Sequence, residues 1–423
     1  MHIPGSSSAV SQPGAVVIGG YATAVSALRS LAREGVRTAV ILTDRNDIAH
    51  RSRYAHEFHR VRRLDKSFDG LIDLLQEQGL RWRGWALIPT TDDALAALAA
   101  HRSLLSRCYP MTVPSGKVVQ QVLQRAATYR IASELGIDVP YHYGPATRQT
   151  ATRSDIVYPV VLRPTESTRF WKMFGTKLFV ARSPLELIAA IDRLEQSGLT
   201  AELFDLVPGS DDQCYTYSVY LDRWGKPAAE FCFRILRKAP RFFGDARAAE
   251  PALAPELRDG TIGLLQRIGW QGVASVEYKR DPRDGRYRLL GITGRAHLSH
   301  GLATRCGVNF PLLSWLEHAR HQPVSASANG WSGRWLHLHT DLLYCALQDR
   351  HDDVSWRELL RSYTSPWVDA VWSAADPAPF VAQCIGTLKK AAREIREGRE
   401  METLKARVQP PPPETFRTSS GSK

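Results

Sequence analysis

Residues that could bind a metal ion and phosphate stand in one stretch, residues 276–295, VEYKRDPRDGRYRLLGITGR. Its alternating pattern predicts two strands joined by a polar turn, with Glu277 as the acidic residue of an otherwise apolar first strand. The second strand ends in Gly291, Ile292 and Thr293. Neighbouring strands can hold a divalent cation between acidic side chains, because hard cations need several oxygen ligands. Only the first strand carries such an acid, so a partial metal site and a purely structural hairpin both stay open.

The charge of the chain indicates an anionic ligand. There are 55 Lys and Arg residues against 43 Asp and Glu residues, a formal net charge of +12. Such an excess can indicate nucleic-acid binding. The basic residues are instead spread from Arg51 to Arg399 and form no single aromatic-rich stripe, so we expect no nucleic-acid partner. A small anion such as a nucleotide triphosphate fits this distribution better, because guanidinium groups bind phosphate oxygens in pairs.

The length and composition predict a globular protein of several domains. The chain has 423 residues, of which 43% are hydrophobic, more than one ordinary core requires. No stretch reaches the roughly 18 to 20 apolar residues of a membrane helix, and the start lacks the pattern of a signal peptide. The six cysteines form no CxxC pair, which favours reduced thiols over disulfides or zinc ligands. We therefore expect a cytoplasmic protein with no membrane partner.

The first elements predict a doubly wound α/β domain. Residues 15–20, AVVIGG, read as a buried strand, the following segment as a helix closed by Gly35, and TAVILTD as the next strand. The loop at Gly19 does not match GxGxxG, although Asp44 ends the second strand where a ribose-binding acid could stand. We interpret the glycines as a small-residue turn that packs the helix on the sheet, and keep a nicotinamide-binding site as an alternative.

The rest of the chain divides by composition. After a flexible leader over residues 1–14, the Rossmann-like domain covers 15–115. Residues 116–325 alternate short strands and helices in an α+β pattern that includes two hairpins. A polar linker then leads into a helical region over 326–408, and the proline-rich tail 409–423 is expected to be disordered.

The order of these parts resembles the ATP-grasp superfamily, most closely its carboxylate-amine ligase branch of D-aspartate ligase-like proteins. The resemblance runs from about residue 15 to 320 and is carried by YPVVLRP, DLVPGSDDQ, YLDRWGKP and VEYKRDPRDGRYRLL in this order. It implies a mixed α/β and α+β fold: a Rossmann-like N-terminal domain, a two-lobed ATP-grasp domain and a C-terminal helical region. Nucleotide would bind between the two lobes.

The resemblance assigns residues to the nucleotide. Arg125 and Arg163 stand where the family has two phosphate-binding lysines, and Lys177 follows in the loop between two small-lobe strands. Arginine keeps the charge but replaces a compact ammonium with a planar fork.

For adenine and ribose, the family uses an acidic residue and backbone groups of the strand that links the lobes. These positions correspond to Asp205, Leu206 and Val207, with Asp212 after the turn able to reach a ribose hydroxyl. A turn aspartate that bonds its own segment is the alternative for Asp212.

Metal and transition-state positions follow from the same resemblance. Glu277 matches the first acidic metal ligand, Arg295 matches an arginine beyond the second strand, and Arg234 aligns with a basic residue facing the transferring phosphate. Gly291 and Thr293 replace the family's glutamate and asparagine, so two of three metal ligands are missing. Glu277 alone would hold Mg²⁺ weakly, because Mg²⁺ keeps several waters and leans on substrate phosphates.

Two histidines follow, His297 and His300, which could act as replacement ligands or as a general base. Imidazole suits zinc better than magnesium, so a structural or substrate-pocket role is the favoured interpretation.

The resemblance implies an ATP-dependent ligase that activates a carboxylate as an acyl phosphate and joins it to an amine. ATP and Mg²⁺ are the expected cofactors, and a small carboxylate and amine are the expected partners. A homodimer through the C-terminal helices stays open. The departures at Gly291 and Thr293 keep an alternative: a degenerate protein that binds nucleotide or a partner without ligase activity.

Overall fold

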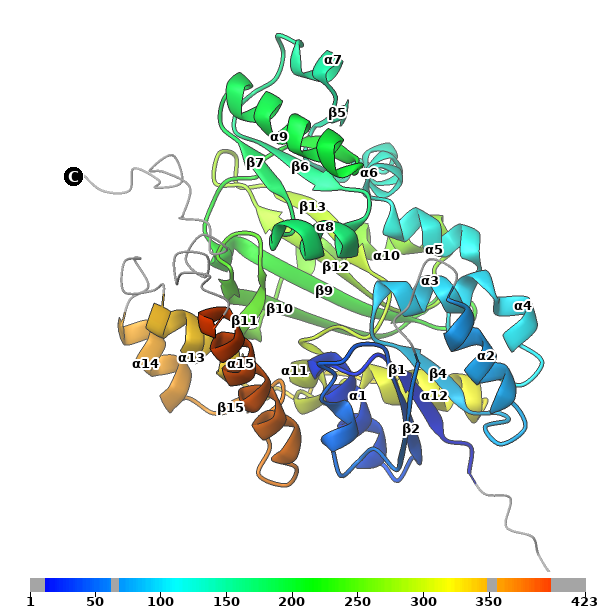
Figure 1. Cartoon of the computed structure of the whole chain (residues 1–423). Coiled ribbons are helices and arrows are strands. Elements are labelled where there is room, and N and C mark those ends of the chain that lie inside the picture. Colours follow the sequence, from blue (N-terminus) through cyan, green and yellow to red (C-terminus); the bar gives the residue numbers. More distant parts are fainter. Residues whose placement is uncertain (1–11, 62–67, 348–355, 397–423) are drawn as a thin grey trace, which may run out of the picture.

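The computed structural model describes residues 12–61, 68–347 and 356–396 (Figure 1). The predicted tail at 409–423 lies outside these residues, as does most of the predicted leader at 1–14. Within the described part, no helix combines the length and the apolar character needed to cross a membrane.

The first domain is a parallel sheet with strand order β3-β2-β1-β4, which confirms the predicted doubly wound start. Its strands are β1 (Ala15–Ile18), β2 (Thr38–Leu42), β3 (Glu57–Arg60) and β4 (Ala86–Pro89). Its helices are α1 (Ala22–Ala32), α2 (Asp69–Glu77), α3 (Asp92–Ala100) and α4 (Arg102–Leu105), with a 3-10 turn η1 (Ala49–Arg51). Alternate residues of β1 enter two different cores, as expected for a parallel sheet covered on both faces.

The glycines after β1 are packed by side chains. A Cβ on Gly19 would lie 2.2 Å from Thr90 Oγ1, and a Cβ on Gly20 would lie 2.3 Å from Asp47 Cγ. Asp47 in turn accepts hydrogen bonds from the backbone N–H groups of Thr43 and Asp44, at 2.7 and 2.9 Å. The space that a pyrophosphate would need is therefore taken by Asp47, and the interpretation of a packing turn agrees with the structure better than a dinucleotide site.

A small lobe follows, with an antiparallel sheet of order β5-β8-β6-β7. It comprises β5 (His142–Pro145), α7 (Arg148–Ala151), β6 (Val160–Pro164), α8 (Ser167–Phe174), β7 (Phe179–Ala181), α9 (Pro184–Ser197) and β8 (Ala201–Asp205). The sequence indicated only a polar stretch between β6 and β7. That stretch instead forms the helix α8, which packs onto the lobe through the fully buried Phe170. The Phe170 ring lies 4.8 Å from the rings of both Phe174 and Phe179.

The large lobe is a seven-stranded sheet of order β13-β12-β9-β10-β11-β14-β15. Its strands are β9 (Cys214–Leu221), β10 (Pro227–Ala239), β11 (Asp245–Pro251), β12 (Gly272–Arg280), β13 (Tyr287–Thr293), β14 (Arg334–Leu336) and β15 (Trp367–Asp369). Both predicted hairpins, β9–β10 and β12–β13, are present and antiparallel. The accompanying helices are α5 (Gly116–Leu123), α6 (Arg125–Glu134), α10 (Arg258–Ile268), α11 (His300–Arg305) and α12 (Phe310–Ala319), with 3-10 turns η2 (Asp211–Gln213) and η3 (Pro255–Leu257).

The C-terminal region contains α13 (Leu338–Leu347), α14 (Trp356–Thr364) and α15 (Ala378–Arg396), but it is not only helical. Its strands β14 and β15 extend the large sheet, and β14 pairs with β11. Buried Asp341 of α13 binds two arginines of this sheet, Arg237 at 2.8 Å and Arg247 at 3.2 Å. Three-residue strands carry too little alternation to be found from sequence.

The same region also contacts the first domain, which lies beside it in Figure 1. Asp376 is 2% exposed and accepts hydrogen bonds from Arg29 Nε at 2.9 Å and Ser52 Oγ at 2.6 Å. The chain therefore forms one assembly in which the first domain, the large sheet and the C-terminal region support one another, while the small lobe projects above the large sheet (Figure 1).

Candidate nucleotide-binding site

A pocket lies between the small and large sheets, with about 390 Å³ of empty space that includes open solvent. Its walls come from the strands β6, β8 and β12, from α6 and from the loop after β10. The lining includes Tyr129, Val161, Arg163, Phe204, Asp205, Leu206, Val207, Phe242, Phe243, Lys279 and Leu290. Apolar and aromatic walls with a few charged groups are typical of a small-ligand site.

The hinge residues lie where the sequence placed them. Asp205 ends β8, and Leu206 and Val207 continue into the turn at Gly209, all three lining the pocket. The apolar pair can pack against a flat base. The structure therefore brings the predicted adenine-binding segment to the pocket, and its role stays a prediction.

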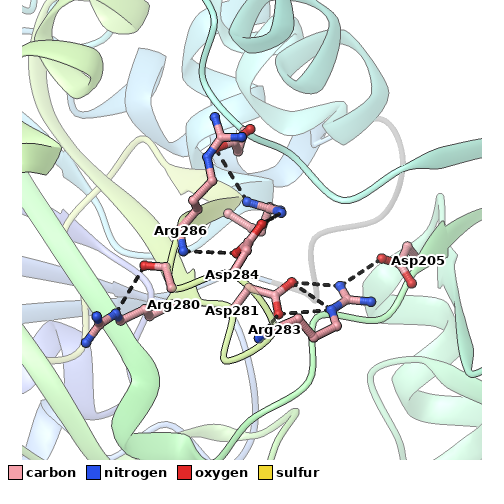
Figure 2. A network of polar contacts seen from close by, with 9 residues as sticks. Asp205, Arg280, Asp281, Arg283, Asp284 and Arg286 are labelled. Carbon is pink, nitrogen blue, oxygen red and sulfur yellow. Dashed lines mark hydrogen bonds and ion pairs between the residues drawn. The ribbon is translucent and has the colours of Figure 1, made fainter.

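Asp205 is already bound within the chain, as Figure 2 shows. Arg283 Nη2 lies 3.2 Å from an Asp205 carboxylate oxygen and 2.7 Å from one of Asp281, so one guanidinium joins the hinge to the β12–β13 turn. Burial raises the pKa of Asp205, and Arg283 opposes that rise. Asp281 is fully buried, which fixes the Arg283 head group in place. Asp205 is thus a structural anchor as well as a candidate adenine contact.

Arg163 is the cation of the pocket that lacks a partner. Its side chain leaves β6 into the cleft, and no hydrogen bond or ion pair to it is found among the described residues. Burial and the nearby charge of Arg125 lower its pKa to about 10. Glu277 opposes this fall but forms no ion pair with Arg163, so the geometry suits an anionic ligand that pairs with the guanidinium directly.

Arg125 and Tyr129 stand on the first turns of α6 and reach across to β13. Arg125 Nε donates to the carbonyl oxygen of Leu290 at 3.2 Å, and Tyr129 Oη donates to the same oxygen at 3.0 Å. Two donors on one carbonyl fix both side chains at the edge of the cleft. The Lys-to-Arg positions predicted from sequence therefore come together in space.

Two buried lysines complete the basic wall, and sequence reasoning missed both. Lys279 is 5% exposed and Lys238 is 7% exposed. Burial and the charge of Lys238 lower the pKa of Lys279, although Cys214 opposes this. Burial also opposes the charged form of Lys238, but Cys214, Asp211 and Glu277 outweigh it and raise its pKa. Lys279 could have been found from its i+2 spacing to Glu277 on one strand face.

For Lys238, the spacing of residues along its strand gives no comparable indication. Lys238 follows two register shifts in the β10–β11 ladder, between Ile235 and Arg237 and between Arg237 and Lys238. A bulge changes which face the next side chain points to, so simple alternation along β10 predicts the wrong side for this residue.

The residues around Glu277 do not fit a dedicated magnesium site. Register places Glu277 of β12 opposite Gly291 of β13, which brings no oxygen ligand. Beside it, His297 Nε2 lies 4.0 Å from Glu277 Oε1. Within residues 12–61, 68–347 and 356–396, no group of three or more His, Cys, Asp or Glu side chains is placed to hold a metal. A single carboxylate supplies only part of the near-octahedral oxygen shell of Mg²⁺, so water and nucleotide phosphates would have to supply the rest.

The histidines near Glu277 are held as neutral rings. His297 Nδ1 accepts from the Ser299 N–H at 3.2 Å, so its own proton is on Nε2 and faces Glu277. His300 Nδ1 accepts from the His297 N–H at 3.1 Å, and His300 Nε2 lies 3.1 Å from Ser275 Oγ. Burial lowers the pKa of both rings. This geometry agrees with a structural or pocket role and not with replacement metal ligands.

Arg234 is the predicted catalytic residue that the structure places elsewhere. Along β9 its register partner is Tyr215, whereas Glu277 pairs with Thr216, so Arg234 and Glu277 project from opposite faces of the sheet. Arg234 forms an ion pair with Glu250 at 2.6 Å. We therefore do not assign Arg234 to the transferring phosphate. The resemblance aligned its position but could not give the strand register.

Lys177 and Arg295 lie at the edges of the cleft. Lys177, just before β7, forms a 2.6 Å ion pair with Asp245 at the start of β11 and so bridges the two lobes. Arg295 follows β13 and pairs with Asp92 of α3 at 2.6 Å. Against the effect of burial, Lys177 lowers the pKa of Asp245, and His297 and Arg295 add smaller effects in the same direction. The predicted ligand roles of Lys177 and Arg295 stay predictions.

Asp212 accepts a hydrogen bond from the Ser210 hydroxyl within its own turn and does not line the pocket. The alternative of a turn aspartate therefore describes it better than a ribose contact.

Comparison with known proteins agrees with this arrangement. No family model matches the sequence. The chain is similar to the D-aspartate ligase of Enterococcus faecium (strain Aus0004), with 22% identity over 266 residues. The match covers 58% of this chain and 61% of the relative, so the chain spans less than two thirds of that protein's length.

Several solved structures share the architecture. N5-carboxyaminoimidazole synthetase of Staphylococcus aureus has a TM-score of 0.60 and 13% identity, covering 81% of this chain and 87% of that chain. Biotin carboxylase of Campylobacter jejuni gives 0.59 and 14%, covering 75% and 74%. L-amino acid ligase of Bacillus licheniformis gives 0.57 and 14%, covering 74% and 75%.

The chain has the ATP-grasp fold. These relatives belong to the ATP-grasp carboxylate-amine ligase group, which confirms the resemblance seen in the sequence. Arg163, Leu206 and Val207 meet in the pocket between the small and large lobes. Identities this low establish the fold alone, so the reaction is a separate question.

Proposed function

We propose that this ATP-grasp protein is an ATP-dependent carboxylate-amine ligase. The observation that carries the proposal is Arg163, a guanidinium without a partner in the described residues, which lines the pocket between the lobes. The similarity to D-aspartate ligase supports a carboxylate and an amine as its substrates.

In the proposed reaction a substrate carboxylate oxygen attacks the γ-phosphorus of ATP, and the bond to the bridging oxygen breaks to release ADP. The acyl phosphate is then attacked by an amine, which loses a proton and expels inorganic phosphate as the amide bond forms. Atoms and charge balance without an oxidant or reductant.

The side chains have separate tasks in this scheme. Arg125, Arg163 and Lys279 hold the phosphate oxygens at the cleft, which positions the γ-phosphorus and stabilises charge that develops during transfer. In this scheme Arg295, which lies at the junction of the lobe and the first domain and pairs with Asp92, would bind the substrate carboxylate. His297 presents an N–H toward Glu277 and so orients that carboxylate.

The test is release of ADP and inorganic phosphate from ATP by purified protein, with pools of carboxylates and amines that include D-aspartate and other amino acids. Product release that requires both a carboxylate and an amine supports the proposal. Arg163→Met should abolish it, while Arg182→Met, which removes an exposed arginine from the same lobe, should not. Wild-type protein that binds ATP yet turns over with none of these pools argues against ligase activity.

A second function is favoured by one observation: the metal-ligand position opposite Glu277 is Gly291, and the guanidinium of Arg125 lies against it. On this alternative the protein binds nucleotide and does no ligation. Nucleotide binding without product release, for every substrate pool above, is its signature.

A further inference from the structure

We infer that the nucleotide site takes its phosphates without a divalent ion, with the guanidinium of Arg125 in the place of the missing metal centre. The inference rests on the proposed nucleotide site and concerns how that site handles charge. The ligand that we infer for this site is a nucleoside triphosphate or diphosphate without a bound metal ion. The starting point is the disagreement between the fold, which implies magnesium, and the donor set around Glu277, which does not fit it.

Arg125 occupies the surroundings of the lost ligand. A Cβ on Gly291 would lie 3.4 Å from Arg125 Nε and 3.5 Å from Arg125 Nη2. The guanidinium therefore covers the glycine, and Leu290 holds it there through its carbonyl oxygen at 3.2 Å. The side chain of a glutamate at position 291 would lie beside the Arg125 guanidinium. Its carboxylate would therefore form an ion pair with Arg125 in preference to binding a metal ion.

The charge balance of the cleft favours an anion over a cation. Four basic side chains converge on it: Arg125, Arg163, Lys238 and Lys279. Three carboxylates lie among them, Asp205, Asp211 and Glu277, and Asp205 is already paired with Arg283. Asp211 accepts from the backbone N–H groups of Lys238 and Phe242 at 2.8 Å each, so its oxygens are occupied.

The remaining carboxylate, Glu277, already faces Arg163, Lys238 and His297. A dication entering here would be repelled by more charges than attract it, whereas phosphate oxygens would satisfy the guanidinium of Arg163 directly. Magnesium bound to ATP in solution would also remove phosphate charge that the arginines need.

The experiment compares ATP binding by calorimetry in EDTA and in excess Mg²⁺, with wild-type protein and ATP as its sodium salt. The expected result is affinity in EDTA equal to or tighter than that in Mg²⁺. Tighter binding with Mg²⁺ overturns the inference and leaves the proposed nucleotide site standing. Absence of binding in both conditions overturns the inference and the proposed function together.

A charge variant tests the role of Arg125. Gly291→Glu should weaken binding in EDTA by about tenfold, because its carboxylate pairs with Arg125 and repels phosphate. The matched control is Gly70→Glu, which adds the same charge to the exposed face of α2, where a Cβ meets nothing within 4 Å. Wild-type affinity in Gly291→Glu overturns the inference. Should that variant not fold, as judged by thermal unfolding, Arg125→Gln must give the same loss.

A combined variant tests the replacement directly. Gly291→Glu, Thr293→Asn and Arg125→Lys together restore the ligand types that the fold implies, on strand positions that share a face with Glu277. We expect binding in this variant to become tighter with Mg²⁺ than with EDTA, a reversal of the wild-type order. An unchanged order overturns the inference that these positions set the metal preference.

Discussion

Replacing Arg163 by methionine should stabilise the free protein and weaken nucleotide binding at the same time. Burial and Arg125 lower the pKa of Arg163 from an ordinary 12.5 to about 10. Both pKa values lie above neutral pH, so the side chain is charged in the folded and unfolded states. The folded state therefore carries the whole free-energy cost of keeping the partly buried guanidinium charged. Each pKa unit corresponds to about 1.36 kcal/mol, which sets an upper limit near 3 kcal/mol.

The realised gain is smaller, because Arg163 is only partly buried and solvent screens its charge. We expect the free energy of unfolding of the free protein to rise by about 1 to 2 kcal/mol. Binding should lose one charge-assisted hydrogen bond, worth about 1.5 to 3 kcal/mol. That amounts to a loss of about 10- to 100-fold in ATP affinity.

Denaturation with and without ATP measures both effects. ATP at about a hundred times the wild-type Kd should stabilise the wild type by roughly 2.7 kcal/mol, and a variant weakened 100-fold by only about 0.4 kcal/mol. Arg182→Met is the control, since that exposed arginine precedes α9 and pairs with Glu186 of that helix. A destabilised free protein, or an ATP effect equal to wild type, would refute the reasoning that Arg163 is a strained cation awaiting an anion.

Three further outcomes follow from the contacts. Asp376→Asn should cost about 3 to 5 kcal/mol in urea unfolding, because it leaves Arg29 charged, 6% exposed and without its carboxylate; a loss below about 1 kcal/mol contradicts this. Burial lowers the pKa of His337 to about 4, so only the unfolded state takes up a proton at this residue as the pH falls from about 6.5 to 4. The free energy of unfolding should therefore drop over that window. His337→Asn should flatten this pH dependence, measured by thermal unfolding. Lys279→Met should weaken ATP binding by about tenfold in calorimetry while leaving the free protein as stable or more so; unchanged affinity would exclude Lys279 from the phosphate site.

The sequence predicted what depends on local pattern and failed where register or distance decides. The strand of residues 15–18 and the hairpin of β12 and β13 follow from periodicity and turn residues, whereas the hinge at Asp205 was expected from the family resemblance. The face of Arg234 depended on its register against β9, which alignment of motifs does not give. Lys238 lay beyond two bulges.

Contacts between residues far apart in the sequence could not be predicted either. Arg29 and Asp376 are 347 residues apart, yet their ion pair joins the first domain to the C-terminal region. The strands β14 and β15 have three residues each and gain their stability from the sheet they extend. Neither a buried pair between distant segments nor so short an added strand leaves a periodic signal in the chain.

Gly291 and Arg125 are best understood as one change. Taken separately, a glycine for a glutamate is a lost ligand, and an arginine for a lysine is a conservative swap. In the structure the missing side chain of Gly291 leaves the space over which the longer, planar guanidinium of Arg125 lies, 3.4 Å from where a Cβ would be. A glutamate there would neutralise the arginine, whereas a glycine leaves its charge for a ligand. If the correspondence with the family's ligand positions holds, the two substitutions together would make this corner of the cleft basic and suit it to phosphate, which is the inference that the Gly291→Glu variant tests.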